Sequence, residues 1–340
     1  MGMGWFRERQ LTHPRPSLPL KGRSTSPFSR VSSVDTFLQQ LLNGLVLGSI
    51  YALVALGYTM VYGIMQLINF AHGEVVMIGA MVALTAIHAL AGSGLPGPLI
   101  VLLGVLISMP VCMALGAGIE RIAYRPLRNA PRLAPLITAI GMSIILQQLA
   151  VLIWGRDYLR FPPLLPEARY HVGGAVVSAL QIFIIGLSAL IMAGLWFLVN
   201  RTKLGRAMRA TSQNPQVARL MGVNTDQIIS ITFVIGAGLA AIAGVMVSAY
   251  YHLAHHLMGS MLGLKAFTAA VLGGIGNLAG AMMGGVLLGI IESLGAGYIG
   301  DLSGGFFGSH YQDVFAFLVL IVVLVFRPSG LFGERVSERA

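Results

Sequence analysis

Apolar runs about as long as the hydrocarbon core of a bilayer follow one another along most of the chain. They cover residues 38–59, 74–91, 98–119, 133–153, 178–199, 228–250, 279–298 and 312–326. A helix needs about 20 apolar residues to cross about 30 Å of hydrocarbon, so each run predicts a transmembrane helix. Two shorter, glycine-rich runs, 60–73 and 264–277, are too short for straight helices and are expected to cross only as broken, tilted or re-entrant segments.

Composition places most of the chain in lipid. Hydrophobic residues make up 56% of the sequence and charged residues 10%, whereas charged residues are roughly 25% of a soluble domain. Cys112 is the only cysteine, so neither a disulfide framework nor a thiolate metal cluster is expected. We predict an all-α polytopic membrane protein with a single transmembrane domain at 37–328.

The net charge of +10 indicates membrane orientation rather than nucleic-acid binding, because the basic residues are unevenly placed. Most of the 22 Lys and Arg residues fall in four stretches, 1–37, 120–132, 200–227 and 327–340. The positive-inside rule assigns such stretches to the cytoplasm. This predicts about ten crossings, two of them short or broken, with both termini cytoplasmic in a bacterial inner membrane. If 60–73 does not cross, the basic N-terminal tail lies outside.

Both ends of the chain are expected to lie outside the transmembrane domain. Residues 1–36 are rich in Arg, Ser and Pro and contain no apolar run, which excludes an ordinary signal peptide. They predict a disordered, basic cytoplasmic tail, because nothing in them can bury itself. A misassigned start codon is the alternative for residues 1–34. Residues 329–340 predict a cytoplasmic C-terminal tail.

The longest inner loop, 200–227, contains the signals of a short helix. Asn214 is a favourable N-cap, Pro215 suits the first helical position and Gly222 suits the position just after the helix. These residues predict a helix of about two turns between hydrophilic flanks.

This helix has an apolar face although the loop is expected in water. Val217, Leu220 and Met221 fall at positions i, i+3 and i+4 and therefore lie on one side of the helix. Such a face either docks on a partner protein or lies on the surface of its own membrane. The residues by themselves leave both interpretations open.

The loop resembles the cytoplasmic coupling loop of permeases of ATP-binding-cassette (ABC) importers, in the form of the branched-chain amino acid family. The resemblance rests on Gly205-Arg206-Ala207 at its start and on Ala218, Leu220, Gly222, Asn224 and Asp226 at its end. Further motifs of that family follow in matching order and spacing, from about residue 37 to about residue 331. They are NGLVLGSIYA at 43–52, GYTMVYG at 57–63, INFAHGE at 68–74, ERIAYRP at 120–126, IGMS at 140–143 and KAFTAAVLGGIG at 265–276.

The resemblance implies a type II-like ABC importer transmembrane domain that moves Leu, Ile or Val by alternating access. The implied partners are a second homologous permease subunit, two cytoplasmic ATPase subunits and a periplasmic amino-acid-binding protein. Within the chain, the coupling residues would be Gly205, Arg206, Asn214, Pro215, Val217, Ala218, Leu220, Met221 and Gly222. Urea and short-amide permeases share many of these motifs and remain the alternative within the class.

Catalysis and cofactors are not expected in this chain. Its only lysines are Lys21, Lys203 and Lys265, and no Gly-Lys dipeptide occurs, so it has no Walker A motif. ATP and Mg are therefore expected on the partner ATPase subunits, and no metal site is predicted. A secondary transporter or channel is the alternative from another class, but it would need no coupling helix. An intramembrane serine protease would need a nucleophile elbow, which the sequence lacks.

Polar residues inside the apolar runs are the candidates for a transport pathway, because such groups are costly in lipid. They are Asn69, His72, Glu74, Gly273, Gly274, Gly276, Asn277 and Glu292. Each has a structural alternative. Gly73 could end a half-helix at the surface with Glu74 in water, the glycines near 280–285 have spacing suited to helix packing, and Glu292 could bond to another helix.

Overall fold

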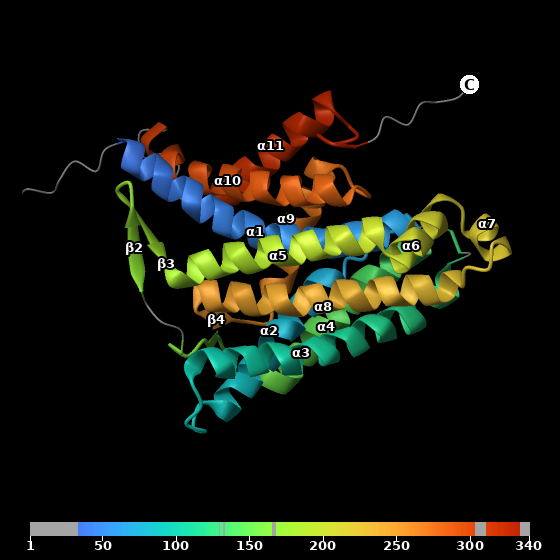
Figure 1. Ribbon diagram of the computed structural model, residues 1–340, viewed down its shortest axis with the longest axis horizontal. Helices are drawn as coiled ribbons and strands as arrows, with labels where there is room; N and C mark the ends of the chain where they lie inside the picture. Colours follow the sequence, from blue (N-terminus) through green and yellow to red (C-terminus); the bar gives the residue numbers. More distant parts are fainter. Residues whose placement is uncertain (1–32, 129, 132, 165–167, 303–310, 334–340) are drawn as a thin grey trace, which may run out of the picture.

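The computed structural model describes residues 33–128, 130–131, 133–164, 168–302 and 311–333. Of the predicted tails at 1–36 and 329–340, residues 1–32 and 334–340 lie outside the described residues, whereas residues 33–36 already belong to the first helix and Leu331 and Phe332 bond to the end of the helix at 258–273. The α-helices are α1 (Ser33–Met65), α2 (His72–Leu90), α3 (Gly97–Ile119), α4 (Leu133–Trp154), α5 (Ala179–Arg201), α6 (Lys203–Gln213), α7 (Pro215–Leu220), α8 (Thr225–Tyr251), α9 (Met258–Gly273), α10 (Leu278–Leu302) and α11 (Gln312–Phe326) (Figure 1).

Seven helices of the described chain are long and apolar enough to cross a membrane, and two shorter apolar helices lie at 258–273 and 316–326. Their burial sorts them into two layers. In the most apolar window of α1, 89% of residues are buried, against 17% in α4 and 22% in α5. Large apolar side chains such as Leu152 and Leu190 are exposed on these outer helices, as expected where lipid or another subunit is the neighbour.

Both predicted helix breaks are present, but one apolar run was interpreted wrongly. The chain is non-helical between α1 and α2, just before Gly73, and again between α9 and α10, where Gly274 and Gly276 have φ values of +105° and +95°. Residues 60–65, however, continue α1, which is 33 residues long, or roughly 50 Å. The run 60–73 is therefore the end of one helix plus a link, and it does not form a separate crossing segment.

The helices run alternately between two ends of the bundle (Figure 1). At one end, Gln39 near the start of α1 donates to Val176 O at 3.1 Å, and Val176 belongs to a β-hairpin. At the other end lie α6, α7 and the last described segment, where Leu331 N donates to Leu272 O at 2.9 Å. Residues 60–73 add no further helix, so the start of α1 and the last described segment lie at opposite ends of the bundle; the side of the membrane on which each lies stays a prediction.

Four short strands modify the all-α prediction. Strand β1 (Leu159–Arg160) pairs with β4 (Leu253–Ala254), and β2 (Arg169–Val172) pairs with β3 (Ala175–Ser178), both antiparallel. All four lie at the end where α1 begins, in loops between long helices. The pattern of apolar residues does not predict these strands, because each is only two to four residues long.

Glycines bring α10 very close to its neighbours. A Cβ atom added to Gly285 would lie 2.4 Å from the Cα atom of Ala52 in α1, and one added to Gly284 would lie 2.1 Å from Ala269 O in α9. Real Cβ atoms do not approach that closely, so side chains at these positions would force the helices apart. The packing interpretation of these glycines is confirmed.

Candidate functional site

A sharp turn places α6 and α7 at the end of the bundle. The side chain of Thr202 caps α6 by accepting from Gly205 N at 3.1 Å. A Cβ atom on Gly205 would lie 2.0 Å from Val199 O, so only glycine allows this close turn between α5 and α6. Arg209 donates from its guanidinium to the same Val199 carbonyl, whereas Arg206 is exposed on α6.

The capping signals of α7 operate as predicted. Asn214 Oδ1 accepts from Gln216 N at 3.0 Å and from Val217 N at 3.1 Å, which satisfies two backbone donors at the helix start. Pro215 occupies the first turn, and Gly222 has a φ of +83° just after the helix. At six residues, α7 is shorter than the predicted two turns.

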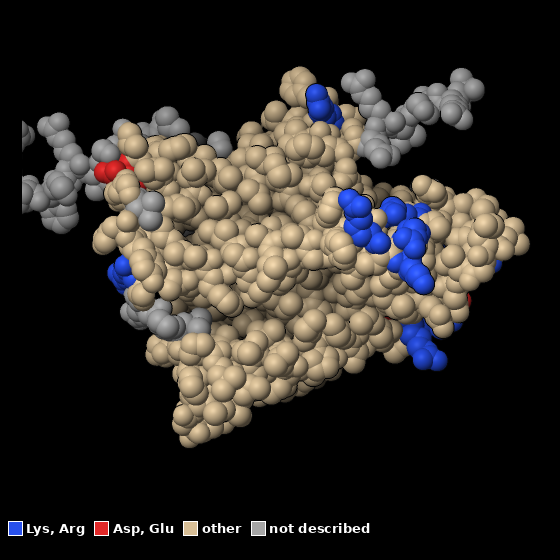
Figure 2. Space-filling view, in the orientation of Figure 1, with Lys and Arg blue, Asp and Glu red and all other residues tan. Residues whose placement is uncertain are grey.

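The apolar face of α7 points away from the rest of the chain. Val217 is 52% exposed, Leu220 86% and Met221 80%, while Ala218 is buried at 3% exposure. Basic side chains surround this end of the molecule (Figure 2). From the described residues they include Arg121, Arg125, Arg128, Arg201, Lys203, Arg206, Arg209, Arg219 and Arg327, whereas Arg156, Arg160 and Arg169 lie at the opposite end.

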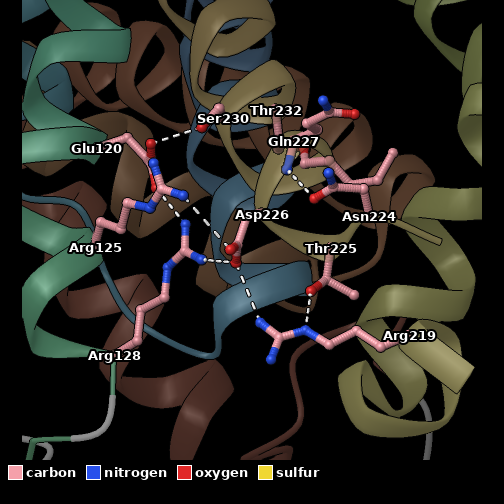
Figure 3. Close-up of polar contacts among 11 residues, drawn as sticks. Glu120, Arg125, Arg128, Arg219, Asn224, Thr225, Asp226, Gln227, Ser230 and Thr232 are labelled. Carbon is pink, nitrogen blue, oxygen red and sulfur yellow. Dashed lines mark hydrogen bonds and ion pairs between the residues drawn. The ribbon is translucent and has the colours of Figure 1, made fainter.

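Beside α7 lies a polar cluster to which the sequence analysis gave no role (Figure 3). Glu120 ends α3 and is 1% exposed, and it pairs with Arg128. Arg128 also pairs with Asp226, in the first turn of α8, and Ser230 donates to Glu120 Oε2 at 2.6 Å. Glu120 and Asp226 belong to the motifs that carry the family resemblance, which was the signal available in the sequence.

The break before α2 holds three of the pathway candidates, all buried. Asn69 Oδ1 accepts from Tyr124 at 3.1 Å. The His72 ring packs edge-on against Tyr58 at a centroid distance of 4.9 Å. Glu74 is fully buried, so its carboxylate is not in water at the surface.

Glu74 is held by side chains of α4. It accepts from Ser143 at 3.1 Å and from Gln147 at 2.7 Å through Oε1. Its Oε2 and the Nε2 of His72 have no hydrogen-bond partner among the described residues.

Glu292 lies in a separate buried ion cluster. Its Oε1 accepts from Lys265 at 2.7 Å and from Tyr51 at 3.2 Å, and Lys265 also lies 2.7 Å from Asp313 Oδ1. The cluster joins α1, α9, α10 and α11. The structure thus bonds Glu292 to other helices, as its structural alternative expected.

The turn between α9 and α10 forms a third location. Asn277 caps α10 by accepting from Gly280 N at 3.1 Å and donates to Phe332 O at 3.0 Å, so it ties the C-terminal segment to this turn. A Cβ atom on Gly273 would lie 1.9 Å from Gly280 O. The eight pathway candidates are thus divided among three places, and their role in a pathway stays a prediction.

Two pockets lie near these places. One of about 90 Å³, lined by Gly276 and Arg209 among others, opens beside α6. A larger one of about 230 Å³ lies at the opposite end, lined mainly by apolar side chains together with Lys265 and His255. Burial and the adjacent His256 lower the pKa of His255.

A bundle with seven apolar helices of spanning length and a capped helix that projects an apolar face defines a multi-pass membrane protein. The chain belongs to the family described as branched-chain amino acid transport system / permease component, whose model matches residues 40–324. As a permease component it is not itself an ATPase, and it works with other components of a transport system.

Several named permease proteins are similar to the chain over most of its length. It is 48% identical to the high-affinity branched-chain amino acid transport system permease protein BraD of Pseudomonas aeruginosa, over 89% of this chain and 98% of that protein. It is 45% identical to LivH of Escherichia coli K12, over 89% of this chain and 97% of that protein. The probable branched-chain amino acid transport permease protein LivH of Methanocaldococcus jannaschii is 28% identical to the chain, over 87% of this chain and 92% of that protein.

Proposed function

We propose that the chain is the permease subunit of an ABC importer that moves Leu, Ile and Val across the bacterial inner membrane. The observation that carries this proposal is the apolar face of α7, which is capped, exposed and unpartnered among the described residues. Family membership supplies the substrate class. The expected partners are a second homologous permease, two ATPase subunits that bind ATP and Mg, and a periplasmic amino-acid-binding protein.

The orientation follows from charge. Basic residues gather at the end that carries α6 and α7, and the positive-inside rule places that end in the cytoplasm. Nine alternating passes, from α1 through α5 and α8 through α11, then put the start of α1 on the periplasmic side and residue 333 on the cytoplasmic side. A type II-like importer fold is part of the same proposal.

The mechanism is alternating access driven by α7. Closure of the ATPase dimer displaces α7, and the permease pair opens and closes a path between its two subunits. The two helix breaks, before α2 and after α9, supply the non-helical backbone that can line such a path. Asn69, His72 and Glu74 are the pathway candidates nearest the first break, and Gly276 lines the cytoplasmic pocket.

Replacing Leu220 with Asp tests the coupling role. An unpaired carboxylate at a desolvated interface costs several kcal/mol, so we expect the ATPase subunits to be lost on purification and leucine uptake to collapse. The membrane domain should still insert, because Leu220 is 86% exposed. Gln213→Glu adds the same charge to the same loop outside the apolar face and serves as the control.

The outcome that contradicts the proposal is equally specific. If Leu220→Asp retains its ATPase subunits and transports leucine at the unmodified rate, then α7 is not the coupling element. The substrate class is tested by competition, in an uptake assay with the importer reconstituted in proteoliposomes. Unlabelled isoleucine and valine should inhibit uptake of labelled leucine, whereas inhibition by urea or a short amide alone would favour the alternative substrate.

A further inference from the structure

One basic side chain links α7 to the polar cluster at the end of α8. Arg219 donates from Nε to Thr225 Oγ1 at 2.7 Å and from Nη2 to Asp226 Oδ1 at 3.1 Å (Figure 3). The guanidinium therefore holds two adjacent residues of α8 in a fork, a geometry that lysine cannot reproduce. Among the described side chains of α7, Arg219 is the one with polar contacts to α8.

The other contacts of α7 with the membrane domain are few. Ala218 is its one buried residue, and the connection to α8 passes through Gly222, whose φ is +83°. Such a turn sets the direction of α7 but provides no side-chain contact that holds α7 against α8. The Arg219 fork is therefore the side-chain contact that fixes how α7 sits on the start of α8.

From Asp226 the contacts continue to α3. Asp226 pairs with Arg128, and Arg128 pairs with Glu120 at the end of α3. Glu120 is buried at the start of the helical segment Glu120–Tyr124 that continues α3, and a buried charge is costly without partners, so Glu120 depends on Arg128 and on the hydroxyl of Ser230. Asp226, in the first turn of α8, is favourably placed and pairs with three arginines, namely Arg128, Arg219 and, at 3.5 Å, Arg125.

Exposure changes steadily along this series of ion pairs. The side chain of Glu120 is 1% exposed, Arg128 16%, Asp226 39% and Arg219 60%. Buried charge pairs are strongly disrupted by removal of one partner, whereas exposed pairs are weak. The buried pair of Glu120 and Arg128 is thus fixed. The exposed pair of Asp226 and Arg219 is the contact that can be altered without unfolding the bundle.

We propose that Arg219, Asp226 and Arg128 are positioning residues that transmit displacement of α7 to the transmembrane helices α8 and α3. This inference rests on the proposed coupling role of α7 and specifies which side chains carry its movement into the membrane domain. It requires that α7 and the ends of α8 and α3 move as one body. Loss of the Arg219 fork lets α7 follow the ATPase while α8 and α3 stay behind.

The test separates ATP hydrolysis from transport in the whole importer, reconstituted with its binding protein in proteoliposomes. Arg219→Ala should keep its ATPase subunits and hydrolyse ATP, but the leucine imported per ATP should fall at least about fivefold. Asp226→Asn should show the same split, and Asp226→Glu should restore most of the ratio. Arg121→Ala is the matched control, because Arg121 is exposed and has no ion pair among the described residues.

A distance measurement provides a readout that a purely structural role would not change. Spin labels on Gln216→Cys in α7 and Ile122→Cys, just after α3, occupy exposed sites, and Cys112 is buried. In the otherwise unmodified importer the distance between the labels should stay constant when ATP is added. In the Arg219→Ala background the distance should change when ATP is added.

Different outcomes would overturn the transmission role of Arg219 and the docking role of α7. Unchanged leucine import per ATP in both Arg219→Ala and Asp226→Asn overturns the transmission role and leaves α7 as the docking element. Retention of ATPase subunits and full transport by Leu220→Asp overturns the docking role itself. If Arg219→Ala loses its ATPase subunits while Arg121→Ala keeps them, Arg219 belongs to the docking surface, and the transmission inference is also wrong.

Discussion

Removal of the positive charge from the buried ion cluster should destabilise the membrane domain strongly. Lys265 is 12% exposed and lies 2.7 Å from Glu292 and from Asp313, which are 1% and 27% exposed. Its ammonium also lies 5.8 Å from the centroid of the Tyr51 ring. Lys265→Met keeps a side chain of similar length but leaves two carboxylates facing each other inside the bundle.

The expected cost follows from the asymmetry of buried ion pairs. Loss of one partner from a buried pair costs about 3–5 kcal/mol, because the remaining charge stays desolvated and unpaired. Here two acids lose their common partner, but Asp313 is exposed enough to take up water. We therefore expect Lys265→Met to lower the free energy of unfolding by about 3 kcal/mol or more.

A second substitution separates this mechanism from simple loss of packing. In Lys265→Met combined with Glu292→Gln, the most buried charge is also removed and Tyr51 can still donate to the amide oxygen. The double variant should recover roughly 1–3 kcal/mol relative to Lys265→Met, the usual coupling between residues in direct contact. Lys203→Met removes an exposed lysine and should change stability by less than about 0.5 kcal/mol.

Equilibrium unfolding in mixed SDS and detergent micelles, followed by tryptophan fluorescence, measures these differences. The reasoning is refuted if the double variant is no more stable than Lys265→Met, because the carboxylate of Glu292 would then not be the source of the cost. An equal loss from Lys203→Met would indicate a general effect of charge on micelle binding.

Two further predictions concern packing and topology. Gly285→Ala should lower the free energy of unfolding by about 1–3 kcal/mol in the same assay, because its Cβ would overlap the backbone of α1. The control Gly118→Ala, with open space around it, should be neutral or slightly stabilising. Equal stability of the two variants would contradict the close α1–α10 contact. A membrane-impermeant maleimide added to intact spheroplasts should label cysteines placed at Val34 and Tyr170, and should reach one at Phe332 only after permeabilisation. Protection of the cysteine at Val34 in intact spheroplasts would indicate that the chain crosses the membrane an even number of times.

Local rules determined much of this protein from its sequence. Each of the eight long apolar runs corresponds to one helix, with most bounds agreeing within a few residues, because the length of a spanning helix is set by the bilayer. The caps at Asn214 and Gly222 likewise act between neighbouring residues, so α7 and its apolar face were predictable. Both helix breaks were also predictable, since the segments around them are short and rich in glycine.

Tertiary structure decided what distant residues do together. Glu120, Arg128 and Asp226 lie up to 106 positions apart in the sequence, and only the packing of α3 beside α8 brings them into one cluster. The same holds for Lys265 with Glu292. Hydropathy indicates that such charges need partners but contains no information about which ones.

The course of the chain between α1 and α2 was also decided by the fold. Nothing in residues 60–65 interrupts helical hydrogen bonding, so α1 continues until Gln66, which has a φ of +53°, and the following link leads into α2 without an additional helix. Hydropathy treated 60–73 as a separate segment because it averages over residues and does not detect where the backbone turns. Continuity of the backbone, rather than apolarity, determined at which end of the bundle α1 begins.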